Sequence, residues 1–197
     1  NPAALKKAAE TKGASLGRGL VNMLRDAATN GAMPAQVDKS AFEVGKNLAA
    51  SAGAVVFRNE VLELIQYAPA SADVYARPLV VVPPQINKFY VLDLAPGKSL
   101  VEYAVTSGLQ VFLISWRNPT PAQRDWGLDT YVSSILEAID ATCEITGSPD
   151  VNALAACAGG ITMMALLGHL AAKGDRRVHA MSLLVALLDT EAESLVG

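Results

Sequence analysis

The sequence has few charged residues and no long apolar run, and both shortages exclude whole classes of protein. Charged residues make up 18% of the chain, and the formal net charge of −3 argues against nucleic acid as a partner. The longest apolar run, residues 181–188, has the length of a strand and is far shorter than the roughly 18 residues of a membrane-spanning helix. The first residues also lack the basic segment followed by an apolar one that marks a secretory signal.

Cysteine and histidine are scarce as well, with two of each in 197 residues. Cys143 and Cys157 fall in different predicted elements, and no spacing typical of metal ligands accompanies them, so we expect no metal site. Cys143 lines up with Ile139 on one face of a predicted helix, which favours a structural role. A thiol that works as a reactive group favours a reducing compartment, so the expected location is the cytoplasm.

What the chain has in quantity is apolar residues, arranged in short runs. Hydrophobic residues make up 51% of the chain, and the mean hydropathy of +0.28 is typical of a protein with a sheet buried on both faces. The length suffices for one α/β domain with a sizeable core. Residues 1–52 are rich in Ala, Gly and Lys with weak helical spacing. We interpret them as a peripheral helical segment that precedes a domain at residues 53–197.

The second part of the chain alternates strands with helices. Continuous apolar runs predict buried strands, and helical periodicity or capping signals separate them. Residues 55–57 and 61–67 are interpreted as an antiparallel hairpin at the edge of the sheet. The pattern as a whole predicts an incomplete, mostly parallel, doubly wound α/β sheet. The expected strands are residues 79–82, 111–116, 151–156 and 181–188, and the expected helices are residues 99–108, 128–147 and 161–173.

One of these strands ends in a thiol. Residues 150–160 read Asp-Val-Asn-Ala-Leu-Ala-Ala-Cys-Ala-Gly-Gly, so Cys157 follows an apolar strand and precedes an amphipathic helix. This pattern is typical of the nucleophile elbow of α/β hydrolases, G-x-S-x-G, with Cys157 in place of the serine. Gly159, Gly160 and Ala155, which stands where the motif has Gly, are the small residues that a strained turn requires. A buried cysteine at a strand end is the competing interpretation.

A nucleophile at position 157 needs hydrogen-bond donors that stabilise the oxyanion formed when it attacks a carbonyl group. The carboxyl ends of parallel strands meet at one edge of a sheet, so we expect Cys157 to lie beside the loops that follow the first two predicted parallel strands. An oxyanion hole consists of two backbone N–H groups. Ala158, directly after the nucleophile, is expected to supply one of them. Pro83 and Pro84 have no N–H, so Gln85, Ile86 or Asn87 must supply the other, and Ile86 or Asn87 is favoured.

Five longer segments, in order along the chain, share their sequence with one family. They are residues 58–60 (Arg-Asn-Glu), 64–69 (Leu-Ile-Gln-Tyr-Ala-Pro), 82–90 (Val-Pro-Pro-Gln-Ile-Asn-Lys-Phe-Tyr), 115–119 (Ser-Trp-Arg-Asn-Pro) and 123–128 (Gln-Arg-Asp-Trp-Gly-Leu). Together with the elbow, they resemble the polyhydroxyalkanoate synthases. Gln85 and the last two segments resemble the class II, Pseudomonas-type enzymes in particular. The resemblance covers nearly the whole chain, more weakly over residues 1–50, and implies an α/β-hydrolase fold.

The resemblance implies an acyltransferase. Enzymes of this family polymerise (R)-3-hydroxyacyl groups, here of medium chain length, from their coenzyme A thioesters, and an acyl group on Cys157 would be the intermediate. Coenzyme A arrives with the substrate, so no separate cofactor is expected. The family also implies a growing polyester chain, a homodimer of the full-length protein, and association with polyester granules in the cytoplasm. A thiol-dependent thioesterase or depolymerase on the same fold remains an alternative, as does a catalytically dead fragment.

The resemblance further implies a His base, oriented by an Asp, in the second half of the fold. Neither histidine of this chain fits that role. His169 is expected far along the helix that starts at the elbow, and His179 at the opposite edge of the sheet. Asp189 is expected to end the last strand at the correct edge, but without a His it completes nothing. We therefore expect the base and its acid to be absent, and the chain to be an amino-terminal fragment that is inactive alone.

Overall fold

The computed structural model describes residues 1–189 and divides the chain into two compact units. The first unit is Asn1–Glu43, and the second begins at Val44. Within residues 1–189, no helix combines the length and the apolar character needed to cross a membrane.

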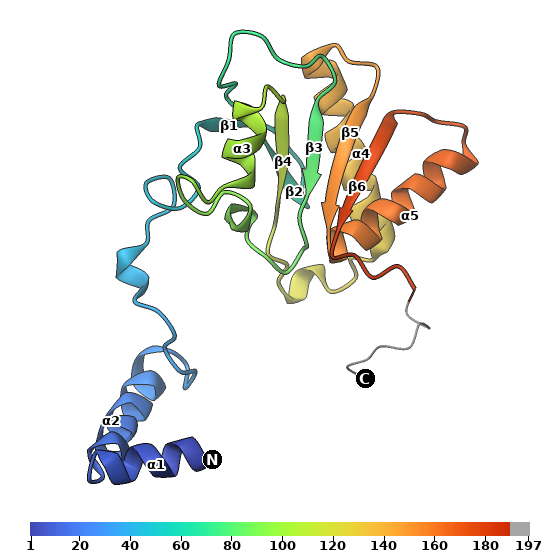
Figure 1. The fold of residues 1–197 in the computed structure, drawn as a ribbon. Coiled ribbons are helices and arrows are strands. Elements are labelled where there is room, and N and C mark those ends of the chain that lie inside the picture. Colours follow the sequence, from blue (N-terminus) through green and yellow to red (C-terminus); the bar gives the residue numbers. More distant parts are fainter. Residues whose placement is uncertain (190–197) are drawn as a thin grey trace. The chain divides into compact units, whose positions relative to one another are not determined.

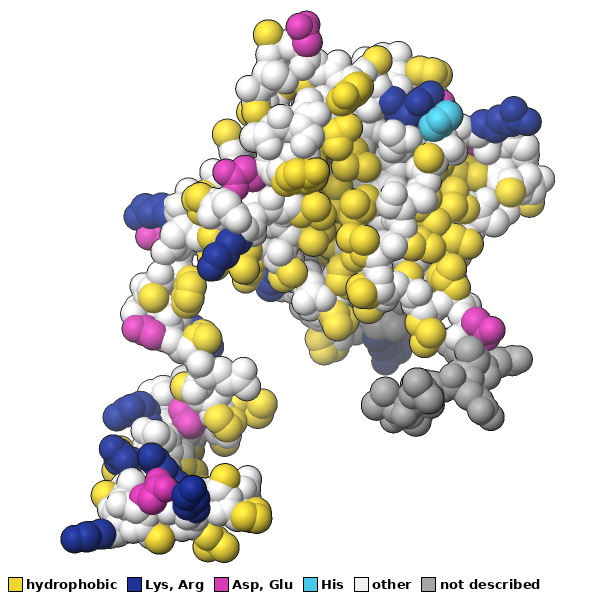
Figure 2. Space-filling view, viewed as in Figure 1, with side chains coloured by type: hydrophobic (Ala, Val, Ile, Leu, Met, Phe, Trp, Pro, Cys, Tyr) yellow, Lys and Arg dark blue, Asp and Glu magenta, His cyan; other side chains and the backbone are white. Residues whose placement is uncertain are grey.

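The first unit is helical and has no core. It consists of α1 (Pro2–Glu10), α2 (Ala14–Thr29) and a short 3-10 turn, η1 (Lys39–Ala41), and none of these three elements contains a buried residue. α1 begins at a cap, since the Asn1 side chain accepts a hydrogen bond from the Ala3 N–H at 3.0 Å. Large apolar side chains of α2 are therefore left in solvent, and Figure 2 shows them beside several basic groups.

The second unit is built on one six-stranded sheet with the order β1-β2-β4-β3-β5-β6 (Figure 1). β1 and β2 form an antiparallel hairpin at one edge, and β2 also runs antiparallel to β4. β4, β3, β5 and β6 run parallel to one another. The predicted edge hairpin and the mostly parallel sheet are confirmed. The strands are β1 (Gly53–Arg58), β2 (Leu62–Tyr67), β3 (Leu79–Val82), β4 (Val111–Trp116), β5 (Val151–Ala156) and β6 (Val178–Leu184).

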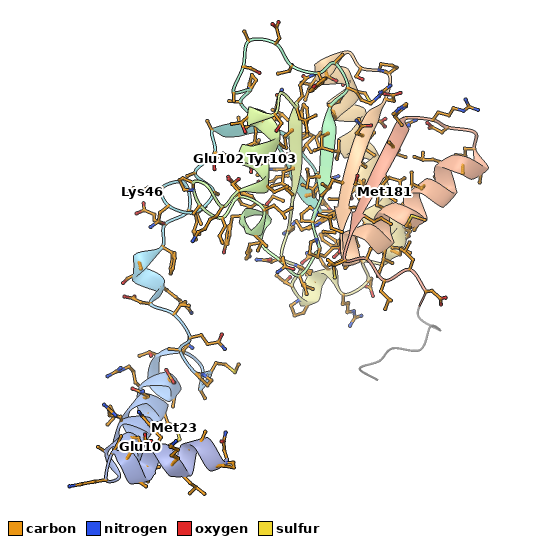
Figure 3. All side chains as sticks on the ribbon, viewed as in Figure 1. Glu10, Met23, Lys46, Glu102, Tyr103 and Met181 are labelled. Atoms are coloured by element: carbon orange, nitrogen blue, oxygen red, sulfur yellow. The ribbon has the colours of Figure 1, made fainter. Side chains whose placement is uncertain are left out.

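Helices cover both faces of this sheet, as a doubly wound fold requires. α3 (Leu100–Thr106) packs on one face through a small apolar cluster, whereas α4 (Leu128–Thr146) and α5 (Ala158–Ala172) belong to the larger cluster on the other face. Figure 3 shows Tyr103 on α3, where its ring is exposed, and Met181 on β6. Two 3-10 turns, η2 (Phe89–Val91) and η3 (Pro121–Gln123), lie in the loops. The predicted doubly wound α/β fold is therefore confirmed.

Two elements, β6 and α5, differ clearly from their predicted bounds. β6 begins three residues before the predicted start, because Val151 pairs with Val178 and extends the ladder. It ends at Leu184, because Val185 has a φ of +47°, which a strand cannot accommodate. Asp189 therefore does not end the strand, and that prediction was wrong. α5 begins at Ala158, three residues earlier than predicted, because the glycines that suggested a turn lie inside the helix.

The start of α3 carries the sequence of a capping box, Ser99-x-x-Glu102, and this box is half formed. The Ser99 hydroxyl accepts a hydrogen bond from the Glu102 N–H at 2.9 Å. The Glu102 carboxylate, however, accepts from the Gly97 N–H at 2.6 Å instead of from Ser99. Gly97 has a φ of +70°, so the loop turns back over the start of α3 and brings its own N–H within reach.

Candidate active site

Cys157 occupies a strained turn between β5 and α5. Its φ of +50° and ψ of −120° lie in a region that residues other than glycine rarely adopt, and such a conformation costs about 1–3 kcal/mol. The Cys157 N–H donates to the Leu184 carbonyl at the end of β6, at 2.9 Å. The Cys157 carbonyl accepts the first helical bonds of α5, from Gly160 and Ile161. The turn thus lifts the side chain out of the sheet, and the thiol is exposed.

The two glycines after Cys157 allow the helix to approach the sheet. A Cβ on Gly159 would lie 2.5 Å from the Val82 carbonyl oxygen and 2.6 Å from the Pro83 carbonyl oxygen. A Cβ on Gly160 would lie 2.7 Å from Cβ of Ala186, beyond the end of β6. No side chain fits at either place without a shift of the backbone. Ala155, by contrast, is fully buried in the larger apolar cluster, which accommodates its methyl group.

The loop after β3 lies directly against this turn. Its first residue, Pro83, is so near to α5 that a Cβ on Gly159 would lie 2.9 Å from the Pro83 carbonyl carbon. Asn87 N–H donates to the Pro84 carbonyl at 3.2 Å and so closes a turn within the loop. Ile86 is 88% exposed at the tip of that turn. Because the Asn87 N–H is engaged in the turn, the geometry favours Ile86 over Asn87 as the partner of Ala158; both assignments stay predictions.

The end of β4 completes the same edge of the sheet. The Trp116 indole N–H donates to the Pro83 carbonyl at 2.7 Å, and this bond is buried. The Trp116 ring packs edge-on against Tyr131, with 5.5 Å between ring centroids. Three strand ends, those of β3, β4 and β5, therefore meet beside Cys157, as the parallel order of these strands implies.

A polar pocket adjoins this edge, and sequence reasoning did not identify it. Its volume is about 430 Å³, and Arg58, Glu63 and Arg117 are among its lining residues. Arg58 pairs with Glu63 at 2.5 Å, and Arg117 donates to the Glu60 carbonyl at 3.3 Å. The antiparallel pairing of Leu62 with Trp116 brings the β1–β2 turn to this place. The Arg-Asn-Glu and Ser-Trp-Arg-Asn-Pro segments carried the signal, but their contact could not be inferred from the sequence.

The two histidines lie far from the Cys157 thiol. His169 is exposed in the last turn of α5, roughly 18 Å from Cys157 along the helix axis. His179 lies near the start of β6, with its Nδ1 3.9 Å from an Asp150 oxygen, at the opposite edge of the sheet.

Burial, with a smaller effect of the Asp140 carboxylate, raises the pKa of the Cys143 thiol. Within residues 1–189, no group of three His, Cys, Asp or Glu side chains is arranged to hold a metal ion.

The comparisons with known proteins identify one family. Residues 1–104 match the family model described as "Poly-beta-hydroxybutyrate polymerase (PhaC) N-terminus". The chain is 60% identical over 197 residues to poly(3-hydroxyalkanoate) polymerase 1 of Ectopseudomonas oleovorans, covering 100% of this chain and 35% of that protein. It is 56% identical over 195 residues to polymerase 2 of the same organism, covering 98% and 35%.

A solved structure supports the fold independently. The crystal structure of a candidate esterase from Staphylococcus aureus matches with a TM-score of 0.51 and 12% identity, over 82% of this chain and 50% of that one. At this identity the likeness shows the fold alone. The chain spans about a third of the length of the polymerases that it matches. The predicted resemblance to the class II, Pseudomonas-type enzymes is confirmed. The chain belongs to the PhaC polymerase family and matches the model of that family's amino-terminal part.

Proposed function

We propose that this chain carries the nucleophile of a poly(3-hydroxyalkanoate) polymerase, and that Cys157 receives the acyl group. The observation that supports this most is the turn at Cys157: an exposed thiol on a strained backbone, at the start of a helix and beside a loop with an exposed tip. The substrate is a medium-chain (R)-3-hydroxyacyl-CoA. Coenzyme A is part of that substrate, and no further cofactor belongs to the proposal.

The transfer exchanges one thioester for another. The Cys157 thiolate attacks the carbonyl carbon, a carbon–sulfur bond to Cys157 forms, and the bond to the coenzyme A sulfur breaks. Coenzyme A leaves as a thiolate and takes up the proton that Cys157 gave to a base. The developing oxyanion is held by the N–H of Ala158, which is unpaired at the start of α5, and by that of Ile86. The 3-hydroxyl of a second acyl group then gives its proton to the base and attacks the enzyme-bound thioester. An ester bond forms, the carbon–sulfur bond to Cys157 breaks, and the Cys157 thiolate leaves the extended chain.

A general base must deprotonate both the thiol and the incoming hydroxyl. His169 and His179 are too far from Cys157 for this, as their places on α5 and β6 show. The curated relatives are about three times as long as this chain. We therefore place the His base and the Asp that orients it in the remainder of the full-length polymerase.

The helical unit supports an association with polyester granules. Leu16, Leu20, Met23 and Leu24 recur at helical spacing on α2, and each is at least half exposed. Five basic and two acidic residues lie within residues 1–29. A basic helix with an exposed apolar stripe is suited to an interface between water and an apolar phase. Cytoplasmic granule association thus has residues to support it, whereas the proposed homodimer rests on family membership alone.

Acyl labelling tests the assignment of Cys157. The full-length polymerase is incubated with radiolabelled 3-hydroxyacyl-CoA, and the denatured protein is counted. We expect label on the native protein and on Cys143→Ala, and none on Cys157→Ala. Label that persists on Cys157→Ala would exclude Cys157 as the acceptor. Free 3-hydroxy acid without polymer would show a thioesterase instead.

A further inference from the structure

The loop that carries the proposed oxyanion donor is held at two points by side chains from other elements. One is the buried bond from the Trp116 indole N–H to the Pro83 carbonyl at 2.7 Å. The other joins the Gln85 side-chain amide, which donates, to the Thr162 hydroxyl oxygen at 2.8 Å. Pro83 and Gln85 flank Pro84, and Gln85 directly precedes Ile86. The exposed tip of the loop is thus attached to the protein on its amino-terminal side.

Thr162 connects the loop to the other proposed donor. Its hydroxyl donates to the Ala158 carbonyl, one helical turn earlier, at 3.0 Å. The same oxygen accepts from the Gln85 amide, so a continuous chain of hydrogen bonds runs from Gln85 through Thr162 to Ala158. Thr162 is 4% exposed, so water competes little for these bonds. Ala158 and the Ile86 loop are therefore coupled through one buried hydroxyl.

The helix geometry explains why this hydroxyl is needed. A threonine in a helix satisfies its own donor with the carbonyl four residues before it, as Thr142 does with Ala138 at 2.8 Å. The Thr142 hydroxyl bond stays within α4, whereas the Thr162 oxygen also accepts from a residue 77 positions away. The close contact of Gly159 with Val82 and Pro83 brings α5 near enough for this second bond.

We propose that Gln85, Thr162 and Trp116 are positioning residues that set the spacing between the two N–H donors of the oxyanion hole. This inference rests on the proposed function. The hydrogen bond that Trp116 donates to Pro83 and the one that Gln85 donates to Thr162 hold the loop against the start of α5. Ile86 then presents its N–H beside that of Ala158. The three side chains do not touch the substrate, and they act through the loop.

The test separates oxyanion stabilisation from the reactivity of the thiol. In the full-length polymerase, Gln85→Ala, Thr162→Val and Trp116→Phe are compared with the native protein for the rate of the first coenzyme A release. We expect each rate to fall about 10- to 100-fold, the cost of a misplaced donor. Alkylation of Cys157 by iodoacetamide needs no oxyanion hole, so its rate is expected to stay within about twofold of the native value. Thr162→Ser, which keeps the hydroxyl, should restore the acylation rate.

Thr142→Val is the matched control, because it removes a buried helical hydroxyl whose bond lies within α4. It should leave acylation unchanged. Gln85 is half-buried on the loop, so Gln85→Ala gives a result even where Thr162→Val does not fold. The double variant Gln85→Ala/Thr162→Val should be no slower than the slower of the two single variants, because both substitutions remove the same hydrogen bond between Gln85 and Thr162. Native acylation rates in Gln85→Ala, or an equal loss of alkylation and acylation, would overturn the proposal. A failure of the proposed function would give a different result from these two outcomes, because Cys157→Ala would then still carry the radiolabelled acyl group.

Discussion

At the scale of single residues, the site depends on backbone rather than on side-chain bulk. Cys157 holds a φ of +50°, and Gly159, two residues later, lies so close to Val82 and Pro83 that no methyl group fits between them. The strain at Cys157 is tolerated because its N–H and carbonyl are both bonded, to the end of β6 and to the first turn of α5. The reactive atom thus stands on a rigid support, which favours a defined geometry of attack.

Gly159→Ala should therefore destabilise the protein and inactivate it. The added Cβ would lie 2.5 Å from the Val82 carbonyl oxygen, and overpacking of this kind costs about 1–3 kcal/mol. Denaturant unfolding and polymer formation of the full-length polymerase measure both effects. Gly168→Ala is the matched control, because its Cβ meets nothing within 4 Å on the same helix. It should be neutral or more stable by about 0.5–1 kcal/mol. Equal stabilities of the two variants would contradict the close approach of α5 to β3.

The two thiols should differ in their rate of alkylation. Burial, and then Asp140, raises the pKa of Cys143 above its ordinary value of 9.0, so the thiolate fraction of Cys143 stays small near neutral pH and grows only above pH 9. Cys157 is exposed. Peptide mapping after brief iodoacetamide treatment at pH 8 should find Cys157 modified before Cys143. Modification of Cys143 should rise as the pH passes 9. Faster labelling of Cys143 at pH 8 would be inconsistent with its burial.

At the scale of elements, the strands that the sequence predicts correctly are those with abrupt ends. β3 lies between prolines, and β4 and β5 are mostly apolar runs that begin within three residues of Gly108 and Pro149. The start of β6 was missed because its first residues, Val178 and His179, follow two arginines and carry no apolar pattern. The bond between Gln85 and Thr162, 77 residues apart, could not be predicted at all. Side-chain contacts across a fold depend on packing that the local pattern does not encode.

The stripe on α2 should govern binding to apolar surfaces. Leu20→Glu replaces an exposed apolar side chain of the stripe with a charge, and the loss of one buried leucine weakens interfacial binding about tenfold or more. Flotation of the full-length polymerase with isolated polyester granules measures the bound fraction. Asn22→Glu, which adds the same charge on the opposite side of α2, is the control and should bind nearly as the native protein does. Equal binding of the two variants would exclude the stripe as the contact surface.

At the scale of the whole molecule, the described sheet ends at an edge that is unusually apolar. β6 is the last strand of the order, and Leu184, Val185, Leu187 and Leu188 at and after its end are exposed. A parallel strand of this kind normally lies between neighbours, and an open apolar edge promotes association with other chains. The 197-residue chain produced alone should therefore self-associate and form no polymer. A cooperative thermal transition of a monomeric chain would contradict this.

A charge on the β6 edge should separate self-association from the lack of polymer formation. Ser182 is exposed on β6, so Ser182→Lys places a lysine on the edge strand, which disfavours pairing with another strand. Size-exclusion chromatography with light scattering should show a larger monomer fraction for this variant of the 197-residue chain. Ser133→Lys makes the same change at an exposed position of α4 and should associate as the native chain does. If both variants dissociate equally, net charge and not the β6 edge controls association. If neither forms polymer as a monomer, association does not account for the inactivity of the 197-residue chain.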